Sequence, residues 1–148
     1  MTESEQTRHF SHPILILLVD DEQSILKAIV RTLRGEGYTI HTADGFESAL
    51  KLIESNDFAV VISDYNMPVA SGADLLGFIQ TRNPNCVRIM LSGAAEADSV
   101  PEEIAEGILH CHRFLSKPWN DDQLRQIIKQ SISEYDAACR AAHGLSAT

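Results

Sequence analysis

The sequence predicts an α/β fold: a doubly wound parallel sheet of five strands, with five helices on its two faces. Short apolar runs alternate with amphipathic stretches along most of the chain, a pattern typical of right-handed βαβ crossovers. The first run, 14–19, is apolar at every position, which favours a strand buried on both faces. A length of 148 residues suits one domain, large enough to bury its own core.

The first half of the chain supplies three strands and two helices. Continuous apolar, β-branched or aromatic residues predict strands at 14–19, 38–42 and 58–62. The first helix is predicted from an apolar stripe at helical spacing: Ile25, Leu26, Ile29, Val30 and Leu33. Asp20 or Asp21 is expected to cap its start, and Gly35 and Gly37 to end it. The second helix has its stripe at Phe46, Ala49, Leu50 and Ile53.

The second half continues the alternation. A helix is predicted at 73–80, a strand at 86–91 and a last strand at 112–116. The segment Ser99-Val100-Pro101-Glu102 fits a capped helix start, and 94–98 is ambiguous. Asn120 is expected to cap the final helix, whose apolar stripe is Leu124, Ile127, Ile128, Ile132 and Tyr135.

Composition limits the class of protein. We expect a flexible tail at 1–12, one domain at 13–136, and a tail or the start of a linker at 137–148. The net charge of −9 argues against binding to nucleic acid or to a membrane surface. No apolar run could span a bilayer, and 1–12 does not resemble a secretory signal. Three cysteines without metal-ligand spacing indicate reduced thiols and a cytoplasmic location.

Polar residues collect where the predicted strands end. Asp20 and Asp21 follow the first strand and Asp64 follows the third, while Ser92 and Lys117 follow the fourth and fifth. Ligands of open parallel sheets bind at this edge. If the strand order is 2-1-3-4-5, the first and third strands are neighbours, and their three carboxylates converge.

Carboxylates this close repel one another unless a cation neutralises them. Mg²⁺ suits such a site, and it attracts phosphoryl oxygens that a Lys and a Ser could also hold. The residues therefore indicate phosphoryl transfer with a carboxylate nucleophile, because no activated Ser-His or Cys-His arrangement is evident.

Five motifs in order support a family resemblance: LLVDDE (17–22), VISDYNMP (61–68), SG (71–72), MLSG (90–93) and FLSKPW (114–119). Over about 13–136 the chain resembles a response-regulator receiver domain, a CheY-like module of two-component signalling. The resemblance implies a flavodoxin-like sheet of order 2-1-3-4-5. It implies a signalling module rather than an enzyme. It also implies Mg²⁺ as cofactor and a histidine kinase or histidine phosphotransfer protein as phosphodonor.

The resemblance also implies a role for each site residue. Asp64 matches the phosphoacceptor, Asp21 the direct Mg²⁺ ligand, and Asp20 a ligand that acts through water. Asn66 matches the residue that lends a backbone carbonyl to the metal. The phosphate-contacting and switch residues are Ser92, Lys117 and Phe114, with Gly93 and Pro118 in support, the latter after a cis peptide bond.

Output is expected through the fourth predicted helix (the one that starts at Ser99), the fifth predicted strand (112–116) and the final helix after Asn120. The receiver of the signal would be an output domain, an effector or a second copy of the chain. In the family that the chain resembles, the position two residues after the switch serine flanks the path of the attacking water. That position is Ala94 here, which has no group to orient the water, so autodephosphorylation should be slow. The chain end resembles receivers joined to HD-type cyclic-di-nucleotide phosphodiesterases or to diguanylate cyclases.

Two alternatives remain open. One is a degenerate receiver that binds partners without phosphorylation. The other is a Mg²⁺-dependent aspartyl phosphatase of the haloacid-dehalogenase type, which would need a second Asp where Asn66 stands.

Overall fold

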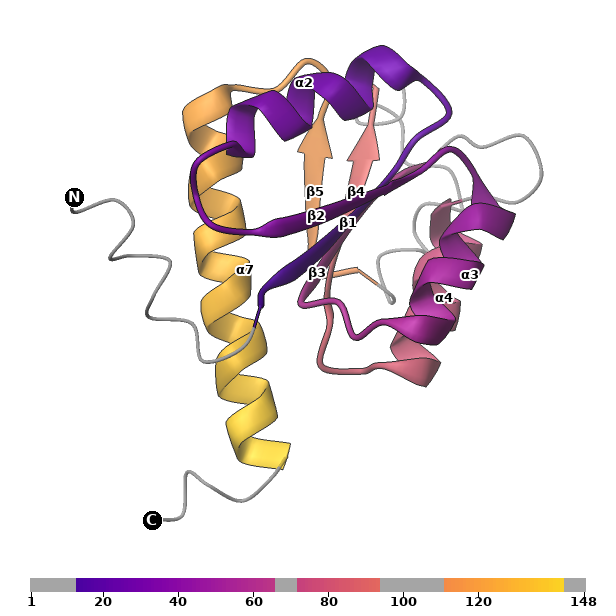
Figure 1. Ribbon diagram of the computed structural model, residues 1–148, viewed down its shortest axis with the longest axis vertical. Helices are drawn as coiled ribbons and strands as arrows, with labels where there is room; N and C mark the ends of the chain where they lie inside the picture. Colours follow the sequence, from indigo (N-terminus) through magenta and orange to yellow (C-terminus); the bar gives the residue numbers. More distant parts are fainter. Residues whose placement is uncertain (1–12, 66–71, 94–110, 143–148) are drawn as a thin grey trace.

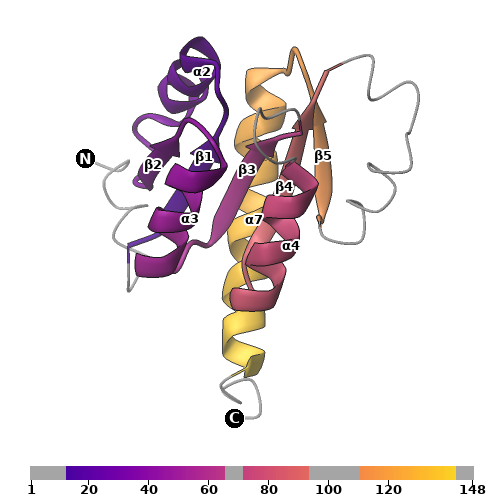
Figure 2. The ribbon, with the colours of Figure 1, turned by 90° about the vertical axis from the view of Figure 1, so that its right-hand side faces the viewer.

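The computed structural model describes residues 13–65, 72–93 and 111–142 and confirms the predicted α/β architecture. Five parallel strands form one sheet in the order β2-β1-β3-β4-β5. Their bounds are β1 Leu15–Val19, β2 Thr39–Ala43, β3 Val60–Asp64, β4 Val87–Ser92 and β5 Arg113–Ser116. Figure 2 shows the strands side by side between two layers of helices.

The described residues contain four of the five expected helices. Their bounds are α2 Gln23–Leu33, α3 Phe46–Ser55, α4 Gly72–Arg82 and α7 Asp121–Ala142. The helix expected from Ser99 lies outside the described residues. Helices α2 and α7 cover one face of the sheet, and α3 and α4 cover the other (Figure 1).

Each face of the sheet has its own apolar core. Alternate residues of the central strands point to opposite sides, so Ile16 and Leu18 pack with α2 and α7, whereas Leu17 and Val19 pack with α3 and α4. Strands β1, β3 and β4 are buried on both faces, which explains why their sequences are largely apolar; buried polar residues such as Arg88 of β4 are exceptions.

Strand β3 differs from its predicted span in a way that matters for the site. It covers Val60–Asp64 instead of 58–62. The ladder continues through polar residues because backbone pairing does not depend on side-chain polarity: Ser63 pairs with Val19 of β1, and Asp64 with Leu91 of β4. Asp64 is therefore the last paired residue of a central strand, which fixes the backbone position of its side chain at the carboxyl edge of the sheet.

The predicted cap of α2 is wrong. Its N-cap residue is Glu22, and no side chain among the described residues caps the helix. The carboxylate of Asp20 instead accepts a hydrogen bond from the Glu22 backbone N–H, through Oδ1 at 2.8 Å, just outside the first helical turn. At the other end Gly35 and Gly37 have φ of 88° and 91°, the left-handed region that favours glycine, so the predicted stop is confirmed.

Helix α7 begins as predicted, with Asn120 Oδ1 accepting the backbone N–H of Gln123 at 3.0 Å. It continues without a break to Ala142, past the domain end expected at 136. Its start is tied to α2, because Thr32 donates to Asp121 at 3.1 Å. The loop between β5 and α7 is therefore fixed beside α2, at the carboxyl edge of the sheet.

Candidate functional site

Three aspartates meet at the carboxyl edge of β1 and β3. Asp20 and Asp21 follow β1 directly, and Asp64 ends the neighbouring strand β3. One carboxylate oxygen from each lies within 4.8 Å of the other two. Asp20 and Asp64 are buried, and Asp21 is exposed. The structure therefore brings together the three carboxylates that the strand order predicted.

Asp20 is the most enclosed of the three carboxylates, with 1% of its surface exposed. Its Oδ1 accepts the Glu22 N–H, but its buried Oδ2 accepts no hydrogen bond from the described residues. Burial raises the pKa of Asp20 and the charge of Asp64 adds to the rise, although the Glu22 N–H and Lys117 partly offset it. The protein thus holds a carboxylate that is poorly stabilised in its charged form.

Lys117 supplies the positive charge of the site from the loop between β5 and α7. Its Nζ lies 3.2 Å from Asp64 Oδ1 and 3.4 Å from Asp20 Oδ2. Burial lowers the pKa of the ammonium, but the hydrogen bond and charge of Asp64, together with Asp20, raise it by more, so the net shift is upward. Lys117 is therefore charged. The Lys117-Pro118 peptide bond is cis, as the resemblance implies.

The aspartate cluster fits a hard divalent cation. Carboxylate oxygens are the ligands that Mg²⁺ prefers, and Asp20 Oδ2 is a buried oxygen whose contact with Lys117 Nζ, at 3.4 Å, is too long to satisfy it fully. Two of the three carboxylates already share one ammonium, so a further cation would relieve the remaining repulsion. The donor set is compatible with Mg²⁺.

The residues expected to act as a switch are placed less completely. Phe114 lies on β5 with 40% of its surface exposed, so its ring points outward in this structure. Ser92 ends β4, where its backbone pairs with Ser116, and the half-buried Gly93 follows it. The Ser92 side chain and all of Asn66 lie outside the described residues.

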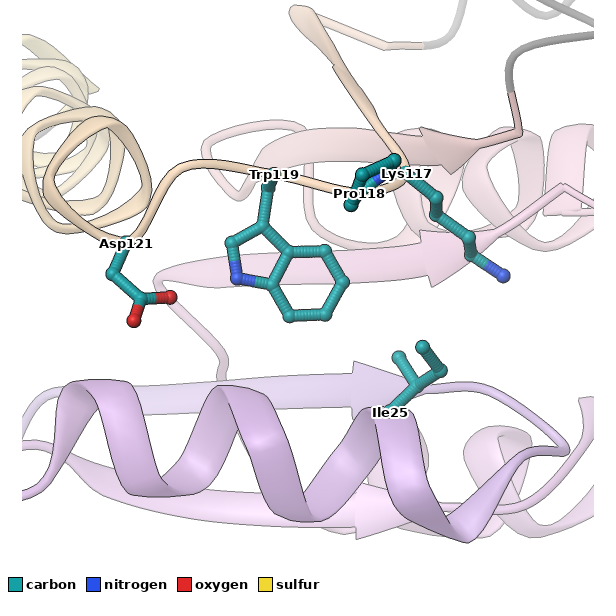
Figure 3. A pocket seen from close by; sticks show the side chains of 5 residues that line it. All are labelled: Ile25, Lys117, Pro118, Trp119 and Asp121. Carbon is teal, nitrogen blue, oxygen red and sulfur yellow. The ribbon is translucent and has the colours of Figure 1, made fainter.

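A hollow of about 440 Å³ lies beside the cluster, between α2 and the loop after β5. Its lining includes Trp119 and Pro118 from the loop and Ile25 from α2, with Lys117 and Asp121 at its ends (Figure 3). Trp119 also packs against the core on this face. This hollow was not predictable from the sequence, because nothing in the spacing of the chain shows that Ile25 and Trp119 face each other.

Glu22 also belongs to the site, although it was not among the predicted site residues. Its Oε1 lies 3.9 Å from Lys117 Nζ, which makes it a third carboxylate around that ammonium. The signal was present, because Glu22 directly follows the two aspartates. Its proximity to Lys117 depends on two long side chains that lie far apart in the sequence.

Comparisons with known proteins agree with the geometry. The family model described as response regulator receiver domain matches residues 16–129. The sensor kinase CckA of Brucella abortus (strain 2308) is 31% identical over 137 residues, which are 89% of this chain and 14% of that protein. The response regulator protein FleR of Pseudomonas aeruginosa is 31% identical over 113 residues, 76% of this chain and 23% of that protein. The chain thus spans less than a third of either relative.

Two solved structures share the fold. The signal receiver domain of an HD domain-containing protein from Pseudomonas fluorescens Pf-5 is 31% identical, with a TM-score of 0.81 over 88% of this chain and 95% of that one. A CheY-like response regulator receiver domain protein from Methanospirillum hungatei JF-1 is 26% identical, with a TM-score of 0.78 over 86% and 99%. In the described part of the chain, no helix has the length and apolar character needed to cross a membrane.

Proposed function

Because this chain belongs to the response regulator receiver domain family, a family of two-component signalling modules, we propose that it is a working phosphoacceptor. It takes a phosphoryl group from a phosphohistidine onto Asp64 with the help of Mg²⁺, and it then changes the surface that it offers to a partner. The observation that carries the proposal is the contact of one ammonium, Lys117, with both Asp64 and Asp20. A degenerate receiver, which binds partners without phosphorylation, would not need the complete set of Asp20, Asp21, Asp64, Ser92 and Lys117.

The residues that would hold Mg²⁺ are Asp20, Asp21 and Asp64, with the backbone carbonyl of Asn66. Bound there, the ion would neutralise carboxylate repulsion and the charge on phosphoryl oxygens. In the transfer, a carboxylate oxygen of Asp64 forms a bond to phosphorus while the P–N bond of the phosphohistidine breaks. The imidazole leaves with the bonding electron pair. Lys117 lies 3.2 Å from the Asp64 carboxylate, within reach of a phosphoryl oxygen held there.

The donor is a histidine kinase or a histidine phosphotransfer protein of the cytoplasm. The donor protein must dock on a surface beside Asp64 without covering the Asp64 carboxylate. The hollow between Ile25 and Trp119 gives apolar contact area next to Lys117 for such a protein. The negative net charge of the chain does not favour nucleic acid or anionic lipid as a direct partner.

Phosphorylation becomes a signal through Ser92 and Phe114. The phosphoryl group adds roughly −1.5 to −2 charge and three acceptor oxygens, to which the Ser92 hydroxyl can donate. When Ser92 moves toward the phosphoryl group it leaves a space behind it, and the ring of Phe114, which is exposed in this structure, then turns inward to fill that space. Burying its ring gains about 1–3 kcal/mol, enough to shift a two-state equilibrium. The changed surface includes β5 and α7, where an output domain, an effector or a second copy would bind.

Small phosphodonors test the proposal without a cognate kinase. The wild type is incubated with phosphoramidate and Mg²⁺, and its intact mass is measured. We expect the mass of one added phosphoryl group, lost when Mg²⁺ is chelated and lost in Asp64→Asn. Asp44→Asn is the matched control, because Asp44 is an exposed aspartate directly after β2. A wild type that stays unmodified would favour the degenerate receiver, and continuous hydrolysis of simple phosphate esters would favour the phosphatase.

A further inference from the structure

We propose that Glu22 selects among small phosphodonors, by setting a negative charge at the entrance of the site; this inference rests on the proposed function. Three carboxylates surround Lys117 Nζ, at 3.2 Å from Asp64, 3.4 Å from Asp20 and 3.9 Å from Glu22. The first two side chains are buried, whereas 62% of the Glu22 side chain is exposed. Glu22 is therefore the outermost charge on the lysine, on the side that faces solvent.

The main chain holds Glu22 in this place from both sides. Its N–H donates to Asp20 Oδ1 at 2.8 Å, and its carbonyl accepts the N–H groups of Ile25 and Leu26 at 3.1 and 3.3 Å. As the N-cap residue of α2 it has extended dihedral angles, φ −94° and ψ 111°, and its side chain does not cap the helix. The carboxylate thus starts from a fixed point at the rim of the site and is available to Lys117.

Folding stability does not explain this arrangement. An ion pair of 3.9 Å with one largely exposed partner contributes little to stability. Its charge nevertheless acts on any ion that approaches Asp64. At a separation of several ångströms near a protein surface, one charge changes the local concentration of a small ion by roughly three- to tenfold.

Removing this charge should have opposite effects on cations and anions. Mg²⁺ should bind more weakly, whereas anionic phosphodonors should react faster once Mg²⁺ is saturating. With acetyl phosphate, an Asp64 oxygen bonds to phosphorus and acetate leaves with the electron pair of the P–O bond. With phosphoramidate, the P–N bond breaks and ammonia leaves. Acetyl phosphate carries more negative charge at neutral pH than phosphoramidate, so its phosphorylation rate should increase more when the Glu22 charge is removed.

The experiment compares the wild-type chain, Glu22→Gln and a control, Glu54→Gln. Glu54 is an exposed glutamate near the C-terminal end of α3, on the face of the sheet opposite α2. Its replacement therefore removes the same net charge far from Lys117. Calorimetric titration measures Mg²⁺ affinity, and intact mass gives phosphorylation rates at saturating Mg²⁺. For Glu22→Gln we expect an Mg²⁺ dissociation constant raised by roughly three- to tenfold and a rate with acetyl phosphate raised by a similar factor. The gain with phosphoramidate should be smaller.

Glu22→Asp, which keeps the charge, should retain the wild-type preference between the donors. If Glu22→Gln reacts with acetyl phosphate at the wild-type rate or more slowly, or if Glu54→Gln shows the same gain, the inference is overturned while the proposed function stands. If the wild type accepts a phosphoryl group from neither donor, the proposed function itself fails, and this inference fails with it.

Discussion

Replacing Lys117 by methionine, an unbranched side chain of similar length without the charge, should destabilise the Mg²⁺-free protein. Lys117 contacts Asp20 and Asp64, whose side chains are 1% and 7% exposed. In Lys117→Met these two carboxylates face each other without their ammonium. The cost arises from their buried repulsion and not from lost packing, because methionine retains most of the apolar stem.

The distances set the scale of the effect. At an effective dielectric constant of about 20, ion pairs of 3.2 and 3.4 Å each correspond to roughly 5 kcal/mol of Coulomb attraction before desolvation is subtracted. Removing one partner of a buried pair costs roughly 3–5 kcal/mol in measured cases. The Lys117 side chain is 21% exposed, so water can enter the vacated space. We therefore expect a loss of about 2–4 kcal/mol in the free energy of unfolding.

The loss should depend on pH with a definite sign. Burial, and then the charge of Asp64, raise the pKa of Asp20 above its unfolded value, and removal of Lys117 raises it further. A carboxylate with a raised pKa destabilises the folded state where it is charged, so the deficit is complete above that pKa and shrinks as the pH falls through it.

Urea denaturation of the wild type and Lys117→Met, at neutral and mildly acidic pH without Mg²⁺, measures this effect. Lys129→Met is the control, because Lys129 is exposed on α7 and its replacement should change stability by no more than about 0.5 kcal/mol. Addition of Mg²⁺ should restore part of the lost stability. Equal stability of Lys117→Met and wild type at neutral pH, or a deficit of the same size in acid, would show that the Lys117 charge does not stabilise the two buried carboxylates.

Three further predictions concern other parts of the domain. Asp21→Asn should abolish the Mg²⁺-induced rise in melting temperature and prevent phosphorylation, while the metal-free protein melts no lower than wild type; a normal Mg²⁺ response would show that Asp21 is not a ligand. Ser92→Ala and Phe114→Ala should each accept a phosphoryl group yet show no change in partner affinity, measured by titration; normal signalling by either would contradict the switch. The bidentate pair of Arg113 and Glu134 lowers the pKa of Glu134. The pair therefore stabilises the fold, by at most about 1 kcal/mol, above the ordinary glutamate pKa, and this stabilisation is lost as the pH falls through the lowered pKa of Glu134. Urea denaturation across acidic pH should show this loss in the wild type and not in Glu134→Gln.

The sheet was predictable because its central strands are buried on both faces. Continuous apolar runs mark such strands, and each of the five predicted strands lies within two residues of its observed start and end. The largest error is at β3, where the polar residues Ser63 and Asp64 remain in the ladder. The convergence of Asp20, Asp21 and Asp64 followed from strand order alone, and the structure brings them within 4.8 Å.

The parts that could not be predicted depend on side-chain conformation and long-range contact. A sequence does not show whether Phe114 points inward or outward, since an aromatic residue in a strand fits either arrangement. The prediction that Asp20 or Asp21 caps α2 was wrong. The Asp20 carboxylate accepts the N–H of Glu22, one residue before the helix, and otherwise faces Lys117 and Asp64. The contact of Glu22 with Lys117 joins the first and last strand ends, which no local pattern reveals.

The most direct measurement identifies the residue that carries the phosphoryl group. The protein is phosphorylated with phosphoramidate and Mg²⁺ and then treated with borohydride, which reduces an aspartyl phosphate to homoserine. Peptide sequencing by mass spectrometry locates the product. We expect homoserine at position 64, in amounts that follow the extent of phosphorylation and vanish when Mg²⁺ is chelated. Homoserine at another aspartate, with position 64 unmodified, would contradict it.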